Sequence, residues 1–287
     1  MHAIEMDGIT RDFATGWRGT KVRALDGVTL QILEGEVVGL LGPNGSGKST
    51  LLKIILGLLA PTAGECRVFG VPSDRVEARV GVGFLPEAPD FPPHLTGFEL
   101  VCFHARLGGV ASAGIRERVA AVISQVGLGE TGHRRIGTYS KGMRQRLGLA
   151  QALVTNPRLV ILDEPTSGID FVGAEETSRM IRSLKARGRT VVFTSHRPEQ
   201  VEELCDRVML LDRGRLVLQS GVAELTQRLG LAALLVDRLP DQMLAELRGW
   251  LCARGVRLHG VGTPQPELRR AIWGRPDGVA GKGVGRS

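Results

Sequence analysis

GPNGSGKST, residues Gly42–Thr50, is the stretch that decides the fold of this chain. It matches the pattern G-x-x-x-x-G-K-S and stands between an apolar run, Val37–Leu41, and a helix-like run, Leu51–Leu59. A buried strand, a glycine turn and a helix in that order form the phosphate-binding P-loop. Because a glycine-rich turn can also join a strand to a helix without binding a ligand, other motifs are needed to corroborate it.

The residue types in this loop fit the binding of a nucleotide. Glycines let the backbone turn with its N–H groups pointing inward, and the following helix adds the positive end of its dipole. Lys48 is expected to reach the β- and γ-phosphates, and the Ser49 hydroxyl is expected to bind Mg²⁺. The predicted ATP-binding residues of the loop are Gly42, Pro43, Asn44, Gly45, Ser46, Gly47, Lys48, Ser49 and Thr50.

A second acidic motif supports nucleotide hydrolysis. Four apolar residues, Leu159–Leu162, precede Asp163 and Glu164. A strand ending there would place the Asp163 carboxylate near the P-loop serine as a metal ligand, and Glu164 could orient an attacking water. An Asp-Glu pair after a strand is often just a solvated loop start. In combination with the P-loop, however, it favours an ATPase.

The composition is that of a globular protein without a membrane span of its own. The 287 residues are 43% hydrophobic and 23% charged, which allows a substantial core. The net charge of +7 is spread along the chain, so we expect a solvated surface and no nucleic-acid partner. No apolar stretch reaches the ~18 residues of a spanning helix, and residues 1–12 lack the apolar core of a secretory signal.

The cysteines give no sign of a metal site or of disulfides. They lie far apart and form no C-x-x-C pair, so reduced thiols are expected at Cys66, Cys102, Cys205 and Cys252.

Apolar runs alternate with helical patterns along the chain. This alternation predicts an α/β P-loop NTPase core with a mostly parallel sheet and an antiparallel N-terminal part. Strands are expected at Ala3–Met6, Val28–Ile32, Val37–Leu41, Gly64–Phe69, Val80–Leu85, Leu159–Leu162, Thr190–Thr194 and Val208–Leu211. Helices are expected at Leu51–Leu59, Gly97–Leu107, Ile115–Val126, Leu147–Leu153, Val172–Lys185 and Glu199–Cys205.

Changes in composition indicate the domain organisation. Prolines cluster between Pro72 and Pro93 and are followed by helical patterns, which predicts a helical insertion at about residues 88–155 within an ATP-binding domain, residues 1–220. Residues 221–273 have patterns of a small α+β appendage. Residues 274–287 are rich in glycine and are expected to be disordered.

Three further motifs make the resemblance specific. Tyr139–Arg146, YSKGMRQR, resembles the signature motif of the ATP-binding-cassette (ABC) ATPases and precedes an apolar helix, as in that family. Pro165–Asp170 resembles the family's D-loop, and Thr194–His196 resembles its switch-histidine strand. The resemblance covers roughly residues 1–220 with all motifs in the family's order.

The resemblance implies a mechanism for these residues. Family members dimerise head to tail, with ATP between the P-loop of one subunit and the signature of the other. The signature residues Ser140, Lys141, Gly142 and Met143 would then bind ATP, with Ser140 and Gly142 at the γ-phosphate. Outside such motifs, a lone histidine after a strand is more often structural and a serine before a helix is an ordinary cap.

The catalytic residues follow from the same resemblance. Glu164 would act as general base or orient the water, His196 would contact the γ-phosphate, and Asp170 would couple the two sites of the dimer. Phe13 stands where the family places an aromatic ring that stacks on adenine. Phe13 could equally be a core residue, and Trp17 in the neighbouring glycine-rich loop is a competitor.

Glu87 departs from the family pattern. The family usually has glutamine here, in the loop that links the ATP site to a membrane subunit. A carboxylate still binds Mg²⁺ and water, but it adds negative charge beside the phosphates. We expect Glu87, as a catalytic and metal-binding residue, to keep the coupling role while altering the affinity for Mg²⁺.

The resemblance leaves three functions to weigh. The favoured one is the ATPase subunit of an exporter, bound at the inner face of the cell membrane to an integral permease of the ABC-2 type and otherwise cytoplasmic. The second is a soluble ABC ATPase acting on nucleic acid or ribosomes, which the short segment between Lys48 and Ser140, without heptads, makes less favoured. The third is a scaffold that binds ATP without turnover, against which the intact Lys48, Asp163, Glu164 and His196 argue.

Overall fold

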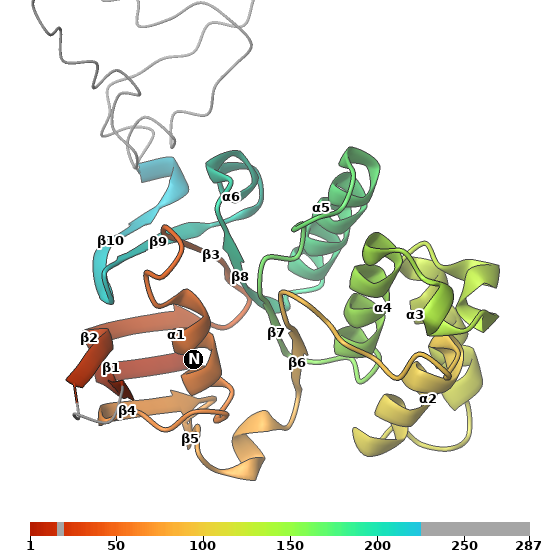
Figure 1. Cartoon of the computed structure of the whole chain (residues 1–287), viewed down its shortest axis with the longest axis horizontal. Helices are drawn as coiled ribbons and strands as arrows, with labels where there is room; N and C mark the ends of the chain where they lie inside the picture. The colour runs from red at the N-terminus through yellow and green to blue at the C-terminus, as the bar shows by residue number, and fades with distance from the viewer. Residues whose placement is uncertain (16–19, 225–287) are drawn as a thin grey trace, which may run out of the picture. The chain divides into compact units, whose positions relative to one another are not determined.

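The computed structural model describes residues 1–15 and 20–224 (Figure 1). The chain divides into two units, Met1–Val222 and Ala223–Ser287, and the fold described here is that of the first. Trp17 lies outside the described residues, and so do the predicted appendage beyond residue 224 and the predicted tail.

A six-stranded sheet carries the loops that matter for function. Its strand order is β10-β9-β3-β8-β7-β6. The strands are β3 (Val37–Leu41), β6 (Val82–Leu85), β7 (Leu159–Leu162), β8 (Thr190–Ser195), β9 (Arg207–Asp212) and β10 (Arg215–Gly221). All neighbours are parallel except β9 and β10, which form an antiparallel hairpin. The loops after β3, β7 and β8 therefore leave the sheet at the same edge.

The central strands are apolar because both faces of the sheet are covered. Every residue of β3, β7 and β8 is buried. This is the continuous apolar pattern of parallel strands. Leu41 pairs with Ser195 and Leu162 with Phe193, so the three strands end nearly level with one another.

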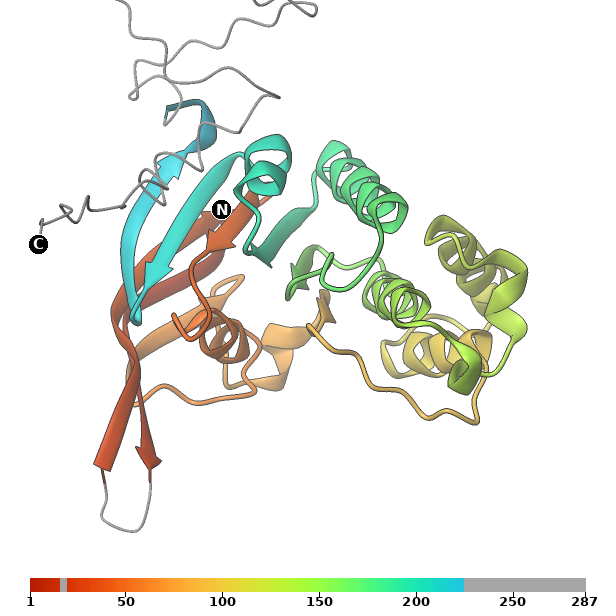
Figure 2. The same cartoon turned by 45° about the horizontal axis from the view of Figure 1, so that its top comes forward.

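A second, four-stranded antiparallel sheet has the order β2-β1-β4-β5. Its strands are β1 (His2–Thr15), β2 (Thr20–Leu33), β4 (Ala63–Val68) and β5 (Val71–Pro72). Figure 2 shows β1 and β2 side by side, extending beyond the other strands at one end. Helix α1 (Lys48–Ile55) packs its apolar residues into one core cluster with both sheets. The P-loop is thereby held between the two sheets.

The helices between β6 and β7 form a separate layer (Figure 1). Helices α2 (Gly97–Leu107), α3 (Ile115–Gln125) and α4 (Lys141–Leu153) pack against one another. Thr96 and Glu99 form a capping box that fixes the start of α2. Short 3-10 turns occur at Val76–Arg79, Gly129–His133 and Ile136–Thr138. Helices α5 (Phe171–Ala186) and α6 (Pro198–Leu204) flank β8 in sequence.

Several predicted boundaries were wrong. Helix α1 ends at Ile55 and not at Leu59, because Gly57 adopts a left-handed φ of 64° that terminates the helix. Helix α4 begins at Lys141, six residues before its apolar run, because its first turn is polar and capped by Ser140. Strand β10 was not predicted. Within residues 1–15 and 20–224, no helix is both long and apolar enough to cross a membrane.

Candidate nucleotide-binding site

The P-loop leaves the end of β3 in a conformation that requires glycine. Gly45 and Gly47 have φ angles of 79° and 105°, which side-chain-bearing residues rarely adopt. Gly47 is also the N-cap of α1, and no side chain caps the helix there. The N–H groups of the first helical turn are therefore available to an anion such as a phosphate.

Lys48 is buried within this loop. Its Nζ donates hydrogen bonds to the carbonyl oxygens of Gly42, at 2.7 Å, and Pro43, at 3.1 Å. Because an ammonium group has three donors, one remains for a ligand. Burial lowers the pKa of Lys48, while the nearby carboxylates of Glu164, Asp163 and Glu87 oppose that shift. The three predicted acidic residues therefore lie near enough to Lys48 to oppose the lowering of its pKa.

Thr194 fixes both acidic residues at the end of β7. Its hydroxyl donates to Asp163 Oδ1 at 2.7 Å and accepts from the backbone N–H of Glu164, also at 2.7 Å. Glu164 has a φ of 48°, which is uncommon outside glycine and is stabilised by this bond. Thr194 belongs to the Thr194–His196 motif of the sequence, but that motif did not predict this positioning role. A polar residue in an otherwise apolar buried strand was the available signal.

The structure brings Glu164 and His196 together. His196 Nδ1 lies 2.9 Å from Glu164 Oε2, and since a carboxylate only accepts, Nδ1 carries the hydrogen. The Glu164 side chain is 10% exposed and that of His196 is 61% exposed. A mostly shielded carboxylate thus faces an accessible imidazole at the ends of β7 and β8.

A second polar cluster holds the loop that follows Glu164. The side-chain oxygen of Gln200, on α6, accepts from the hydroxyls of Thr166 and Ser195, each at 3.2 Å. Gln200 is buried and was also missed by the sequence analysis. The bonds tie the start of the D-loop to the end of β8.

The signature residues lie at the start of α4. Ser140 caps the helix by accepting from the Met143 N–H at 3.2 Å. A side chain at Gly168 would collide with Lys141, so the signature and the D-loop are in contact. Asp170 caps α5 by accepting from the Gly173 N–H at 2.9 Å. In the part of the chain that the structure describes, no hydrogen bond or ion pair joins these residues, or Gly142, to the P-loop.

Phe13 and Glu87 are two further residues that the sequence assigned to the site. Phe13, on β1, is 36% exposed, and the guanidinium of Arg11 lies over its ring at 4.7 Å. One aromatic face is therefore already engaged in a cation–π contact. Glu87 is exposed in the loop after β6, and its charge still acts on Lys48.

The donor set fits Mg²⁺ bound together with a nucleotide. Ser49 lies in the first turn of α1, and the Asp163 and Glu87 carboxylates lie close enough to Lys48 to raise its pKa. Mg²⁺ prefers oxygen ligands and is commonly held by one or two carboxylates plus phosphates and water. Among the described residues, no group of three or more His, Cys, Asp or Glu could hold a metal by itself.

These features define a P-loop nucleotide-binding protein, and the comparisons specify its family. The ABC transporter family model matches residues 25–167. The daunorubicin/doxorubicin resistance ATP-binding protein DrrA of Streptomyces peucetius is 36% identical over 91% of this chain and 78% of its own length. The chain therefore belongs to the ABC transporter ATP-binding family.

Two other similarities support this assignment. An uncharacterized ABC transporter ATP-binding protein of Nostoc sp. PCC 7120 is 41% identical over 74% of this chain, and the match spans only 64% of that relative's length. Among solved structures, the dimeric post-hydrolysis state of the ATP-binding cassette MJ0796 bound to ADP and Pi is 27% identical. It has a TM-score of 0.71 and covers 76% of this chain and 98% of the other.

Proposed function

We propose that this chain hydrolyses ATP to ADP and phosphate and thereby powers a membrane transporter. The observation that carries the proposal is the convergence of Lys48, Asp163, Glu164 and His196 at the ends of three neighbouring parallel strands. This arrangement joins a phosphate cradle, a metal-binding carboxylate and a candidate base in one place.

ATP binding would use the backbone of the P-loop and the Lys48 ammonium. The uncapped N-terminus of α1 presents N–H groups to the phosphates, and Lys48 adds a positive charge in a shielded position. Ser49 and Asp163, with Glu87, would hold Mg²⁺, which neutralises phosphate charge. Phe13 would stack on adenine on the face that Arg11 leaves free.

Hydrolysis would be assisted by Glu164. A water oxygen forms a bond to the γ-phosphorus while the bond from that phosphorus to the β–γ bridging oxygen breaks. The Glu164 carboxylate orients the water and accepts its proton, and Thr194 keeps the Glu164 backbone in place. His196, held against Glu164, reaches the γ-phosphate from the accessible side.

A second copy of the chain would complete the site. The N-terminus of α4 carries Ser140 and Gly142 and has no acidic residue in its first turn. Within the described residues it makes no hydrogen bond to the P-loop of its own chain. A head-to-tail dimer would bring this positive helix end, which Ser140 caps, to the γ-phosphate bound by the other chain. The dimeric state reported for MJ0796 supports this arrangement. Asp170, beside the signature, would couple the two sites.

The transporter would be an exporter with an ABC-2 type permease. The name of DrrA assigns it to drug resistance, which supports export for this chain as well. The segment from Glu87 to Phe98 leads from the end of β6 into the first turn of α2 and would pass movement from the ATP site to the permease. The chain would then be cytoplasmic and peripheral on the inner face of the membrane.

Phosphate release by the purified chain tests the catalytic proposal. We expect Mg-ATP-dependent release that stops with EDTA and falls at least ~100-fold in Glu164→Gln. Glu34→Gln, which removes an exposed ion pair with Arg158, is the matched control and should keep wild-type activity. Full activity in Glu164→Gln would refute the assignment of the base.

A further inference from the structure

The turn between β9 and β10 contacts the P-loop directly. The N–H of Gly214 donates to the carbonyl oxygen of Ser46 at 2.9 Å. Arg213 and Gly214 have φ angles of 47° and 78°, as in the tight turns that join antiparallel strands. A side chain at Gly42 would come within 2.2 Å of the Leu211 carbonyl oxygen, so the P-loop also packs against the end of β9.

This contact orients a phosphate-binding donor. In a trans peptide the C=O and the following N–H point in opposite directions. Because Gly214 holds the Ser46 carbonyl toward the turn, the N–H of Gly47 in the same peptide unit points away from the turn. Gly47 is the N-cap of α1, where an N–H can bind a phosphate. The turn therefore controls the direction of one donor of the cradle.

Strand β2 holds the turn in place from the other side. The N–H of Asp26 donates to the carbonyl oxygen of Gly214 at 2.9 Å. The Ala24 carbonyl lies so close to Gly47 and Gly214 that an added Cβ would sit 2.6 and 2.7 Å from it, respectively. The turn therefore lies between β2 and the P-loop and contacts both. A displacement of β10 would move the Gly214 N–H that binds the Ser46 carbonyl oxygen.

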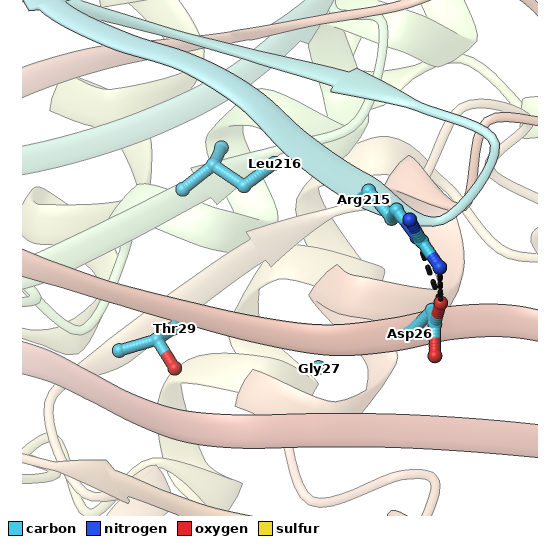
Figure 3. Close-up of a pocket in the computed structure, with 5 residues that line it drawn as sticks. All are labelled: Asp26, Gly27, Thr29, Arg215 and Leu216. Atoms are coloured by element: carbon cyan, nitrogen blue, oxygen red, sulfur yellow. Dashed lines mark hydrogen bonds and ion pairs between the residues drawn. The ribbon is translucent and has the colours of Figure 1, made fainter.

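A network of ion pairs also holds the β9–β10 turn against β2. Asp26 Oδ2 accepts from two nitrogens of Arg215, at 2.6 and 2.8 Å, and Asp26 Oδ1 accepts from Arg23 at 2.9 Å. Arg23 also pairs with Asp12 at 2.9 Å, next to Phe13. The Arg215–Asp26 pair borders an open hollow lined by Asp26, Gly27, Thr29, Arg215 and Leu216 (Figure 3).

Both carboxylates of the network, Asp12 and Asp26, are paired with arginine. Hydrogen bonds from Arg215 and then Arg23 lower the pKa of Asp26, and the hydrogen bond from Arg23 lowers that of Asp12. A single exposed ion pair contributes little to the stability of a protein. The four linked charges here instead fix the position of the backbone hydrogen bonds beside them. One end of the network, Asp12, is next to Phe13 in the sequence, and the other end, Arg215, follows the β9–β10 turn.

We propose that Asp12, Arg23, Asp26 and Arg215 form a positioning network that sets the affinity of the P-loop for nucleotide by holding the β9–β10 turn against Ser46. The inference rests on the proposed ATP-binding function and deepens it. None of the four residues touches the reacting atoms. Their removal should therefore weaken nucleotide binding while leaving the rate at saturating ATP intact.

The test compares Arg215→Gln and Asp26→Asn with the conservative variant Arg215→Lys and with Glu34→Gln as a matched control. Glu34 pairs with Arg158 at 2.8 Å and precedes β3, at the end of that strand away from the P-loop. The measurements are the Kd for a fluorescent ADP analogue, the KM and kcat for Mg-ATP, and the melting temperature, all on the full chain.

We expect Arg215→Gln and Asp26→Asn to raise the Kd for ADP and the KM for ATP by ~3–10-fold, with kcat within about twofold of wild type. Arg215→Lys should recover much of the affinity, and Glu34→Gln should match wild type. High salt should weaken ADP binding by wild type more than by Arg215→Gln.

Three outcomes would overturn the proposal. One is an unchanged Kd in both network variants, with wild type binding ADP normally, which would leave the proposed ATPase function standing. The second is a loss of affinity that follows a loss of melting temperature and is equal in Arg215→Lys, since this would indicate a merely structural role. The third is a wild-type chain that binds no nucleotide, which would remove the proposed function as well.

Discussion

The P-loop half and the signature half of the candidate site are built differently. The P-loop half is enclosed: Lys48, Asp163 and Glu164 are buried, and each is fixed by hydrogen bonds from the same chain. The signature half is open, since Ser140 is bound only within its own helical turn and Lys141 is exposed. The P-loop half is thus held entirely by its own chain, whereas the signature half is the one that we propose a second chain completes.

Because of this difference, substitutions in the two halves should affect different properties of the protein. Substitutions in the enclosed half should alter folding and nucleotide binding of a single chain, because the groups there depend on one another. Substitutions in the open half should leave the single chain intact and affect what happens when two chains meet.

Glu164→Gln should give the largest effect. Loss of the base should lower kcat by ~10²–10⁴-fold, while the Kd for ADP stays near wild type because Gln retains the size of the side chain. Rapid-quench measurement of a single turnover checks this result. A loss of ADP binding equal to the loss of kcat would instead mean that Glu164 belongs to the binding machinery of the P-loop half.

Gly42→Ala and Gly142→Ala form a matched pair across the two halves. At Gly42 a methyl group would lie 2.2 Å from the Leu211 carbonyl, whereas at Gly142 the nearest atom, of Ile169, is 3.5 Å away. We expect Gly42→Ala to destabilise the chain by about 1–3 kcal/mol and Gly142→Ala to leave the melting temperature unchanged or higher. Thermal denaturation decides between them. Equal destabilisation would contradict the separation of the halves.

Glu87→Gln should shift the Mg²⁺ dependence of hydrolysis. Removing a negative charge near Lys48 and the phosphates should raise the Mg²⁺ concentration needed for half-maximal activity by a fewfold, with kcat largely retained. Titration of MgCl2 at fixed ATP measures the shift. An unchanged titration curve would show that Glu87 takes no part in the metal site.

The acid stability of the chain should depend weakly on Asp26. Its pKa is lowered in the folded chain by Arg215 and Arg23, so its contribution to stability is complete above about pH 4 and is lost as the pH falls through the folded pKa. The melting temperature of Asp26→Asn should therefore be below wild type at pH 7 and approach it at pH 3. A constant difference across this range would contradict the linkage.

The sequence predicted the P-loop half of the site better than the residues that hold this half in place. The glycine pattern and the apolar runs of β3 and β7 locate the P-loop and Asp163, because backbone conformation and burial leave a local signal. Gln200 and Arg215 leave no such signal, since their roles depend on which strands and loops become neighbours. Thr194 leaves only a weak one, as a polar residue in the apolar strand β8. Strand β10 was missed because it lies at the sheet edge with alternating exposed residues.

The role of the open half could not be predicted from burial or packing. Ser140 is an exposed N-cap of α4, and serine is a common N-cap residue in helices of any function. Its proposed role depends on a phosphate held by a second chain, so that role leaves no trace in the packing of its own chain.

The most direct test of the claim that a second copy completes the site is the molar mass of Glu164→Gln in solution. Sedimentation of this variant should give a monomer without nucleotide or with ADP and a dimer with Mg-ATP. Adding Ser140→Arg should abolish the dimer while ADP binding persists. A mass that does not respond to ATP, or a dimer that survives Ser140→Arg, would contradict the account.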